Sequence, residues 1–224
     1  MVGDVHGCAD ELADLLRACE HGRSDEVVFV GDLVAKGPDS RGVLAAFRAL
    51  GARGVRGNHD AHVLRWLDAR DRGEAPPSLG RAHRDVAEAL DERDWATLRD
   101  LPPWLRLPTH GALVVHGGVV PGVALELQDP RLLMNLRTLR PDGTGSTRAE
   151  DGVLWGQAWP GPELVLFGHH ARAGLQRHPH AIGLDTGCVY GGQLSACILP
   201  ARAIVSVPAR RAWTPVEPEP GEVR

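Results

Sequence analysis

The chain of 224 residues is poor in lysine and in aromatic side chains. Lys36 is the single lysine among 25 basic residues, and aromatic residues make up 4% of the chain. All other basic side chains are arginines, as a GC-rich genome favours through its codons. With a formal net charge of -4, the chain lacks the basic excess of proteins that bind nucleic acids through phosphate contacts. We therefore expect no nucleic acid among its partners.

The sequence also lacks long apolar runs and paired cysteines. No apolar stretch approaches the length of a membrane span, and the first residues, MVGDVHG, have neither the basic start nor the apolar run of a signal peptide. The cysteines lie far apart, without a CxxC pair, at Cys8, Cys19, Cys188 and Cys197. These absences predict a cytoplasmic protein with reduced thiols, no disulfide framework, no zinc knuckle and no membrane partner.

Strands and helices alternate in the first half of the sequence, and strands dominate the second half. Apolar residues at helical spacing predict helices over residues 10–20, 40–50 (with Ser40 as the cap), 62–67, 81–90 and 91–101. Short apolar runs predict strands within 27–30, 53–57, 112–118, 164–170, 181–187, 193–200 and 201–207. This order favours an α/β fold in one domain, with two sheets and helices packed outside them. We expect that domain to cover residues 1–207 and the Pro/Glu-rich residues 208–224 to form a disordered tail.

Polar side chains that can bind metals follow almost every expected strand. The segments are GDVHG, GDLVAKGPDS, GNHD, VHGG and FGHH, and the candidate ligands in them are Asp4, His6, Asp32, Asn58, His116 and His169. A single histidine at a strand end is more often a hydrogen-bonded structural residue than a ligand. Five segments with the same arrangement, each flanked by glycine, are hard to explain as ordinary turns. In α/β folds such strand ends gather ligands at one edge of the sheet.

The chemistry of these side chains indicates a pair of divalent metal ions. Three imidazoles, two carboxylates and one amide form a donor set without thiolate that suits manganese, and also iron, zinc or cobalt. Six donors are too many for one catalytic ion with open positions, but they suit two ions that share a bridging carboxylate. Two ions roughly 3.5–4 Å apart can clamp the attacking and leaving oxygens of a phosphoryl displacement and lower the pKa of a water between them. The sequence therefore predicts a phosphohydrolase.

The ordered series of motifs resembles that of the calcineurin-like metallophosphoesterases, and within them the phosphoprotein phosphatase superfamily. The resemblance extends from about residue 2 to about residue 200. GDLVAKGP, GNHDAH and LDTGCVYGGQLSA are more similar to bacterial symmetrical diadenosine tetraphosphatases than to Ser/Thr phosphatases. The resemblance implies a four-layer α/β/β/α sandwich, with two mixed sheets flanked by helices.

The resemblance also implies a role for each matching residue. Asp4 and His6 would hold the first metal ion, and Asp32 would bridge both ions. The second ion would be held by Asn58, His116 and His169. His59 would be the general acid that protonates the leaving oxygen, and Asp60 would orient its imidazole and raise its pKa.

Two residues are expected to bind the phosphates of the substrate. Lys36 stands where the family has an arginine, so the charge is kept but the bidentate fork is lost. Arg137 is the second candidate, with Arg140 as a rival, and either can instead be a solvated helix residue. His170 replaces the family's Thr or Trp and faces either substrate or solvent. Almost no chain precedes the expected first strand, which fits a start codon upstream of Met1.

Three functions are compatible with these motifs. The first is symmetrical hydrolysis of diadenosine tetraphosphate to two ADP; the second is a Ser/Thr protein phosphatase or broad phosphomonoesterase using the same metals. A non-catalytic binding module is the third and weakest, because no ligand position is lost. The partner is then a dinucleoside polyphosphate or another phosphorylated substrate. Aromatic surfaces for a base are scarce, and the candidates, each also a candidate for the core, are Trp66, Trp155, Trp159 and Tyr190.

Overall fold

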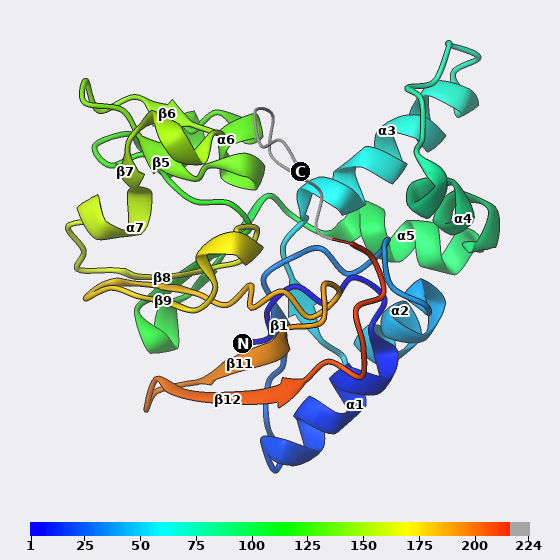
Figure 1. Ribbon diagram of the computed structural model, residues 1–224, viewed down its shortest axis with the longest axis horizontal. Helices are drawn as coiled ribbons and strands as arrows, with labels where there is room; N and C mark the ends of the chain where they lie inside the picture. Colours follow the sequence, from blue (N-terminus) through cyan, green and yellow to red (C-terminus); the bar gives the residue numbers. More distant parts are fainter. Residues whose placement is uncertain (216–224) are drawn as a thin grey trace.

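The computed structural model describes residues 1–215 (Figure 1). The α-helices in this part are α1 (Ala9–Ala18), α2 (Ser40–Ala49), α3 (Asn58–Asp71), α4 (Arg81–Ala89), α5 (Glu92–Asp100), α6 (Pro130–Asn135) and α7 (Trp155–Ala158). The strands are β1 (Val28–Phe29), β2 (Arg53–Gly54), β3 (Trp104–Leu107), β4 (Ala112–Val115), β5 (Thr138–Leu139), β6 (Gly145–Ser146), β7 (Val153–Leu154), β8 (Leu164–Phe167), β9 (Gln176–Arg177), β10 (Ala181–Gly183), β11 (Gln193–Ile198) and β12 (Ala203–Pro208).

Two mixed sheets form the centre of the molecule. In sheet A, β1 pairs with β2 in parallel, and β11 pairs with β12 antiparallel. Val2 joins the two pairs, because it bridges to Phe29 in parallel and to Ala196 antiparallel. Sheet B has the order β3-β4-β8-β10-β9, with parallel pairing in its centre and antiparallel pairing at both edges. A third, small sheet has the order β6-β5-β7.

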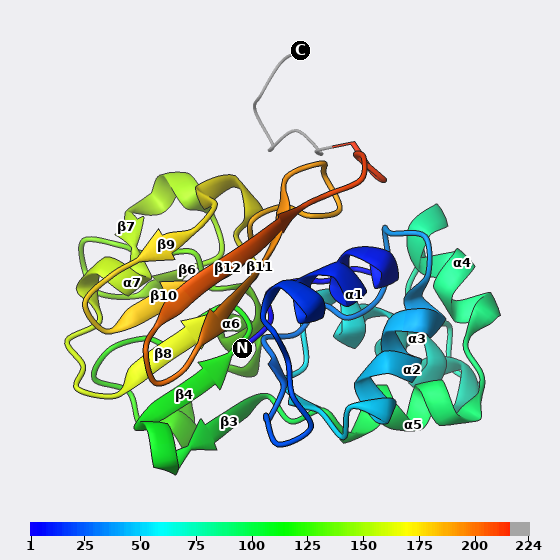
Figure 2. The same cartoon turned by 90° about the horizontal axis from the view of Figure 1, so that it is seen from below.

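Alternation along the strands divides the apolar residues among three cores. Because successive strand residues point to opposite faces, Val28 of β1 packs with Val114 of β4 in a core between sheets A and B. Phe29 instead faces a core shared with helices α1, α2, α3 and α5. Val115 of β4 faces a third core, together with Trp155 of α7. Figure 2 shows α1–α5 gathered on one side of β11 and β12 of sheet A, and Figure 1 shows α6, α7 and β5–β7 grouped together on the side of β8 away from sheet A.

Most of the expected helices and strands are present, with one correction at a helix start. Ser40 was expected to cap α2, but Asp39 is the cap, and its side chain accepts a hydrogen bond from Gly42 N at 2.7 Å. Ser40 is the first helical residue, and its hydroxyl accepts from Ala35 N at 3.1 Å. Its side chain therefore fixes the loop after β1 rather than the helix end. Among the described residues, no helix has the length and apolar character needed to cross a membrane.

The packed body extends beyond the boundary predicted at residue 208. Pro208 is the last residue of β12, and the chain after it lies against the core. Trp213 donates from its indole Nε1 to Glu11 Oε1 at 3.0 Å and from its backbone N to Val189 O at 2.9 Å. Residues 209–215 are thus held in place, and the rest of the predicted tail, residues 216–224, lies outside the described residues.

Candidate metal centre

The structure brings the six predicted ligands together at one end of the two sheets. Asp32 follows β1, Asn58 follows β2, and His116 and His169 follow β4 and β8. Asp4 and His6 follow the bridge residue Val2. The strand segments pair in parallel within each sheet, so their carboxyl ends lie at the same edge, as expected for a ligand site in an α/β fold.

Backbone hydrogen bonds tie the first two loops to each other. The carbonyl of Asp32 accepts from Val5 N at 3.2 Å and from His6 N at 2.8 Å, and Gly37 N donates to His6 O at 2.8 Å. Gly168 N donates to His116 O at 2.8 Å, which joins the loops after β4 and β8. The positions of the ligand side chains are therefore fixed by main-chain contacts.

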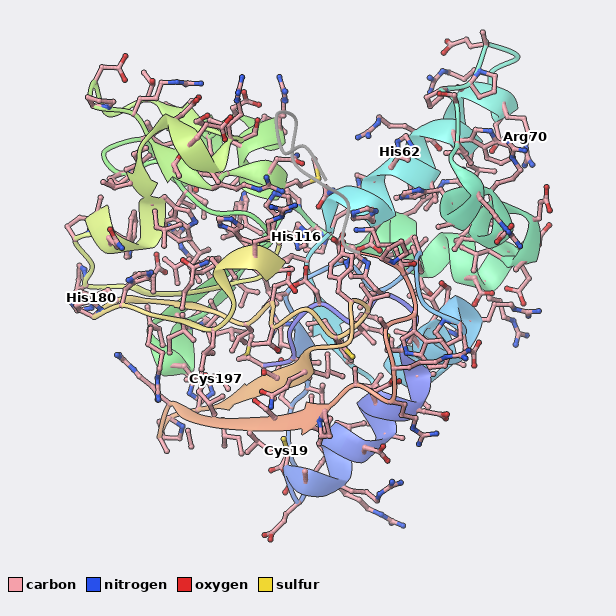
Figure 3. The ribbon with its side chains drawn as sticks, in the orientation of Figure 1. Cys19, His62, Arg70, His116, His180 and Cys197 are labelled. Atoms are coloured by element: carbon pink, nitrogen blue, oxygen red, sulfur yellow. The ribbon has the colours of Figure 1, made fainter. Side chains whose placement is uncertain are left out.

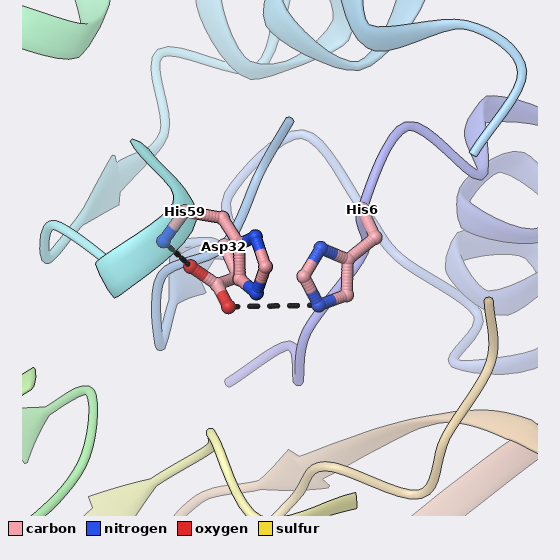
Figure 4. Close-up of side chains that lie close together, drawn as sticks. All are labelled: His6, Asp32 and His59. Atoms are coloured by element: carbon pink, nitrogen blue, oxygen red, sulfur yellow. Dashed lines mark hydrogen bonds and ion pairs between the residues drawn. The ribbon is translucent and has the colours of Figure 1, made fainter. Parts of the chain in front are cut away.

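Asp32 lies at the centre of the cluster. Its Oδ2 is 3.5 Å from His6 Nε2 and 3.3 Å from His116 Nε2, and its Oδ1 accepts from His59 N at 2.9 Å (Figure 4). Burial would raise the pKa of the Asp32 carboxyl, but His116, His59 and His6 outweigh burial and hold that pKa well below its usual value. Asp32 is thus an anion in a buried position, in contact with nitrogen atoms from three other segments.

Two imidazoles are held in a form that suits metal binding. His116 Nδ1 donates to the carbonyl of Val30 at 2.9 Å, and His6 Nδ1 lies 3.3 Å from the carbonyl of Val34. A backbone acceptor fixes a hydrogen on Nδ1 and directs Nε2 into the cluster, as in many metal-binding histidines. Burial lowers the pKa of His6 to about 4, so its Nε2 keeps a lone pair. Burial also acts to lower the pKa of His116, but Asp32 and Asp4 raise it to about 10, so a metal ion would displace a proton from its Nε2. Both Nε2 atoms face Asp32. Figure 3 shows His116 near the middle of the molecule.

Asn58 and the remaining ligands complete the second half of the cluster. Asn58 Oδ1 is 3.0 Å from both His116 Nε2 and His169 Nδ1. Asp4 Oδ2 accepts from His169 N at 3.0 Å, whereas its buried Oδ1 has no partner among the described residues. Burial raises the pKa of Asp4 well above its usual value, and the nearby Asp185 adds to the shift.

Backbone strain is concentrated at this cluster. His6, Asp32 and His169 have φ angles of +49°, +51° and +70°, a region that residues other than glycine rarely adopt. Glycine is required beside them, because a Cβ at Gly57 would lie 2.0 Å from Asp32 Oδ1 and a Cβ at Gly168 would lie 1.9 Å from Asp4 Oδ1. Strain of this kind costs about 1–3 kcal/mol per residue and persists mainly at functional sites.

Asp60 does not contact the imidazole of His59, contrary to the expectation from the sequence. Asp60 Oδ1 accepts from Leu33 N at 3.0 Å and from Val34 N at 3.3 Å, and its Oδ2 accepts from Gly57 N at 3.0 Å. Three consecutive residues at a helix start point in different directions, since the helix turns about 100° per residue. Asp60 therefore joins the start of α3 to the loop after β1.

His59 is instead bonded to Lys36 and His83. Its Nε2 lies 2.8 Å from Lys36 Nζ, and its Nδ1 lies 2.8 Å from His83 Nε2. Burial lowers the pKa of His59 well below its usual value, and among its neighbours Asp32 opposes the shift while His6, Lys36 and His83 add to it. The resemblance implied that Asp60 raises this pKa, but the side chain of Asp60 is bonded to backbone N–H groups instead.

Of the two arginines that were candidates for phosphate binding, the structure places only one near the cluster. Arg140 donates to Asp151 at 2.8 Å, to Ser146 Oγ at 3.1 Å and to Gly145 O at 2.8 Å, so it is part of the β5–β6 turn. Arg137 lies near the cluster: burial lowers the pKa of His169, and His116 and then Arg137 add to the shift.

Two residues near the site were not singled out from the sequence, a third was named only as a candidate aromatic surface for a base, and a fourth was left undecided. His83 bonds His59, Tyr190 OH accepts from Lys36 Nζ at 2.6 Å, and burial raises the pKa of Asp185 to about 6. Asp185 had a signal in the sequence, since LDTG follows an apolar run as the other motifs do. His170 is buried, and burial followed by the charge of Arg137 lowers its pKa to about 4.

Among the aromatic candidates, Tyr190 borders the site and Trp155 belongs to the core. Trp155 is 1% exposed, and its Nε1 donates to Gly117 O. The guanidinium carbon of Arg70 lies 5.1 Å from the ring centroid of Trp66, and both residues lie on α3. Trp159 donates to Glu163 O at 2.9 Å.

A family model described as calcineurin-like phosphoesterase matches residues 1–174 of the chain. The chain is 31% identical to the symmetrical bis(5'-nucleosyl)-tetraphosphatase of Janthinobacterium sp. strain Marseille, over 92% of this chain and 94% of the relative. It is 27% identical to the asymmetrical bis(5'-nucleosyl)-tetraphosphatase PrpE of Oceanobacillus iheyensis, over 95% of this chain and 93% of that protein.

One solved structure is similar over nearly the whole chain. It is the crystal structure of a candidate diadenosine tetraphosphatase, 40% identical, with a TM-score of 0.84 and coverage of 93% of this chain and 91% of that chain. The range of the family match contains the positions of all six predicted ligands, and the structural match covers nearly the whole chain.

Proposed function

Because the chain belongs to the calcineurin-like phosphoesterase family, we propose that it hydrolyses dinucleoside tetraphosphates symmetrically. The substrate would be diadenosine tetraphosphate and the products two molecules of ADP. The observation that carries the proposal is the gathering of six metal-binding side chains around the buried carboxylate of Asp32. The relatives named as tetraphosphatases support the choice of substrate.

The residues at the site fit a pair of divalent ions. Asp4 Oδ1 is buried without a partner among the described residues, and the Nε2 atoms of His6 and His116 both face Asp32. Such buried polar atoms are costly unless a ligand satisfies them. In our proposal one ion is held by Asp4, His6 and Asp32, and the other by Asp32 with the remaining ligands, Asn58, His116 and His169.

Manganese is the metal that we propose, since the donors are imidazoles, carboxylates and an amide without thiolate. Bound divalent ions would supply Lewis-acid chemistry, which neutralises charge on phosphoryl oxygens and activates water. The protein's own contribution is the rigid placement of the donors described above.

The remaining polar residues are assigned to the substrate and to the leaving group. Lys36 Nζ and the guanidinium of Arg137 would bind non-bridging phosphate oxygens. His59 would donate a proton from Nε2 to the leaving oxygen. Lys36 Nζ is bonded to His59 Nε2 in this structure, so a phosphate that attracts the ammonium would free that nitrogen to bind the proton that it then donates.

We also propose an order for the layers of helices and sheets in the fold. The three apolar cores support a four-layer α/β/β/α arrangement, in which β5–β7 accompany α6 and α7 in the outer layer over sheet B.

Product analysis tests this function. With manganese, we expect diadenosine tetraphosphate to give ADP alone, and to turn over faster than a phosphoserine peptide or p-nitrophenyl phosphate. AMP and ATP as products would instead indicate the asymmetrical reaction that the Oceanobacillus relative is named for. Faster turnover of the phosphopeptide would indicate a protein phosphatase.

A further inference from the structure

The hydrogen-bonding pattern of His59 has one consistent assignment for its neutral ring. The ammonium of Lys36 can only donate, so His59 Nε2, at 2.8 Å from Lys36 Nζ, accepts. The neutral ring then carries its hydrogen on Nδ1 and donates it to His83 Nε2 at 2.8 Å. His83 in turn carries its own hydrogen on Nδ1.

The relative orientation of the two rings supports this bond. The planes of His59 and His83 are 6° apart, and their centroids are 4.9 Å apart. The distance between the centroids is close to the sum of the 2.8 Å between the two nitrogens and the radius of each ring. The facing nitrogens therefore lie between the two ring centres. The nearly parallel planes and the 2.8 Å between the two nitrogens fit an N–H···N bond between the imidazoles.

The carboxylate nearest in sequence cannot take this place. Asp60 is already bonded to the backbone N–H groups of Leu33, Val34 and Gly57. Turning Asp60 toward His59 would leave these buried donors without an acceptor, which is costly inside a protein. Among the described residues, His83 is the partner that the structure gives to His59 Nδ1.

Packing of α4 against α3 holds His83 in position. His83 N donates to Gly80 O at 3.1 Å at the start of α4, and Val86, one turn further, is buried in the core shared with α3. The ring of His62 on α3 lies against His83 at 4.7 Å, with an interplanar angle of 88°. His62 lies on the same helix as His59 and is visible on α3 in Figure 3.

We propose that His83 is a positioning residue for His59 in the proposed hydrolysis. By accepting the Nδ1 hydrogen, His83 keeps the imidazole turned so that Nε2 faces the phosphate side, where Lys36 now lies. This inference rests on the proposed function, in which His59 protonates the leaving oxygen.

The proposed step balances without any transfer to His83. A water oxygen forms a bond to one of the two central phosphorus atoms and releases a proton to solvent, and the bond from that phosphorus to the bridging oxygen breaks. The bridging oxygen keeps the electron pair and takes the proton that His59 Nε2 binds from solvent once the phosphates have drawn Lys36 Nζ away. His83 accepts the Nδ1 hydrogen bond of His59 before and during this step.

Kinetics with leaving groups of different basicity tests the proposal. Phenolate is a stronger base than p-nitrophenolate, so it depends more on a proton donor. We expect His83→Ala to lower kcat on phenyl phosphate by about tenfold, in the range for residues that orient a reacting group, with a clearly smaller loss on p-nitrophenyl phosphate. KM and metal content should stay close to those of the unaltered protein.

Three further variants separate the hydrogen bond from packing. His83→Gln should retain most of the activity, because the amide oxygen can accept the Nδ1 hydrogen in place of Nε2. His62→Ala, which removes a ring in contact with His83 but not with His59, should behave like the unaltered protein. In a double-mutant cycle, adding His83→Ala to His59→Asn should cause no further loss. A His62→Ala enzyme as slow as His83→Ala, or an additive double variant, would overturn the proposal.

A spectroscopic measurement tests the bond independently of activity. In the intact zinc-loaded protein, which is diamagnetic, NMR should show a slowly exchanging His59 Nδ1 hydrogen with a coupling to His83 Nε2, and His83→Ala should lose it. Absence of that coupling in the unaltered protein would refute the bond. Equal losses of His59→Asn on both leaving groups would instead refute the role of His59 in the proposed function. If His59→Asn lost more activity on phenyl phosphate than on p-nitrophenyl phosphate but His83→Ala did not, only the inference on His83 would fail.

Discussion

Asp32 contacts donors from three other segments of the site. One oxygen faces the imidazoles of His6 and His116, and the other accepts from the backbone N of His59. Its side chain therefore links the two halves of the donor cluster, and the whole cluster depends on its negative charge.

Asp32→Asn should remove most of the bound metal and nearly all activity. The amide keeps the shape of the carboxylate but loses its charge, and the loss of several kcal/mol of electrostatic stabilisation corresponds to about a thousandfold in rate. Metal content per chain and turnover of diadenosine tetraphosphate measure the effect, with far-UV circular dichroism as the control for folding. Two retained metal ions in the variant would contradict a bridging role.

His59→Asn should impair the reaction according to the leaving group. General acid catalysis contributes on the order of 10²–10⁴-fold, so an alkyl phosphate should lose about that much rate, and p-nitrophenyl phosphate clearly less. Metal content should not change, because the His59 side chain contacts Lys36 and His83. Loss of a metal ion in this variant would mean that His59 is itself a ligand.

At the level of elements, the start of α3 directs three consecutive side chains toward three different parts of the site. Asn58 faces His116 and His169, His59 faces Lys36, and Asp60 faces the backbone of the loop after β1. The sequence was sufficient to place this motif at a strand end and a helix start. The sequence could not show that these three side chains point in different directions, because their directions depend on how the start of α3 packs against the loop after β1.

Contacts between residues far apart in the sequence account for the other features that could not be predicted. Helices α1 to α5 were predicted well because their apolar faces recur at helical spacing. Strands β5, β6 and β7 have two residues each, too few for a visible alternation. His83 lies 24 residues from His59 on a helix that showed no ligand motif, so the contact between them appears only when α4 packs on α3.

Asp60→Asn should weaken the fold and reduce activity on all substrates alike. The amide group would direct an N–H toward the backbone N–H of Gly57, so a buried donor loses its acceptor, at a cost of about 1–3 kcal/mol. We expect a lower melting temperature and equal losses on phenyl phosphate and p-nitrophenyl phosphate. A selective loss on phenyl phosphate would restore the role for Asp60 that the sequence suggested, as the partner of the His59 imidazole.

At the scale of the whole molecule, the donor cluster joins loops from both sheets. The loops that carry Asp4, Asp32 and Asn58 belong to sheet A, and those that carry His116 and His169 belong to sheet B. The two sheets also share one apolar core. Ions bound between these loops would therefore connect the two halves of the fold as well as serve the reaction.

Metal binding should accordingly raise the stability of the entire domain. A ligand that binds the native state alone stabilises it by about 2.7 kcal/mol at a free concentration of 100 Kd, and 1 kcal/mol shifts the melting temperature by about 2–4 °C in a domain of this size. Chelation should thus lower the melting temperature by about 5–11 °C for each ion removed, and added manganese should restore it with about two ions per chain. Arg140→Ala, which alters the β5–β6 turn away from the donors, should keep the manganese-dependent shift, whereas Asp32→Asn should lose most of it. Because the shift depends on the donors bridging both sheets, a single unfolding transition should move as a whole. A shift of equal size in Asp32→Asn would show that manganese binds elsewhere.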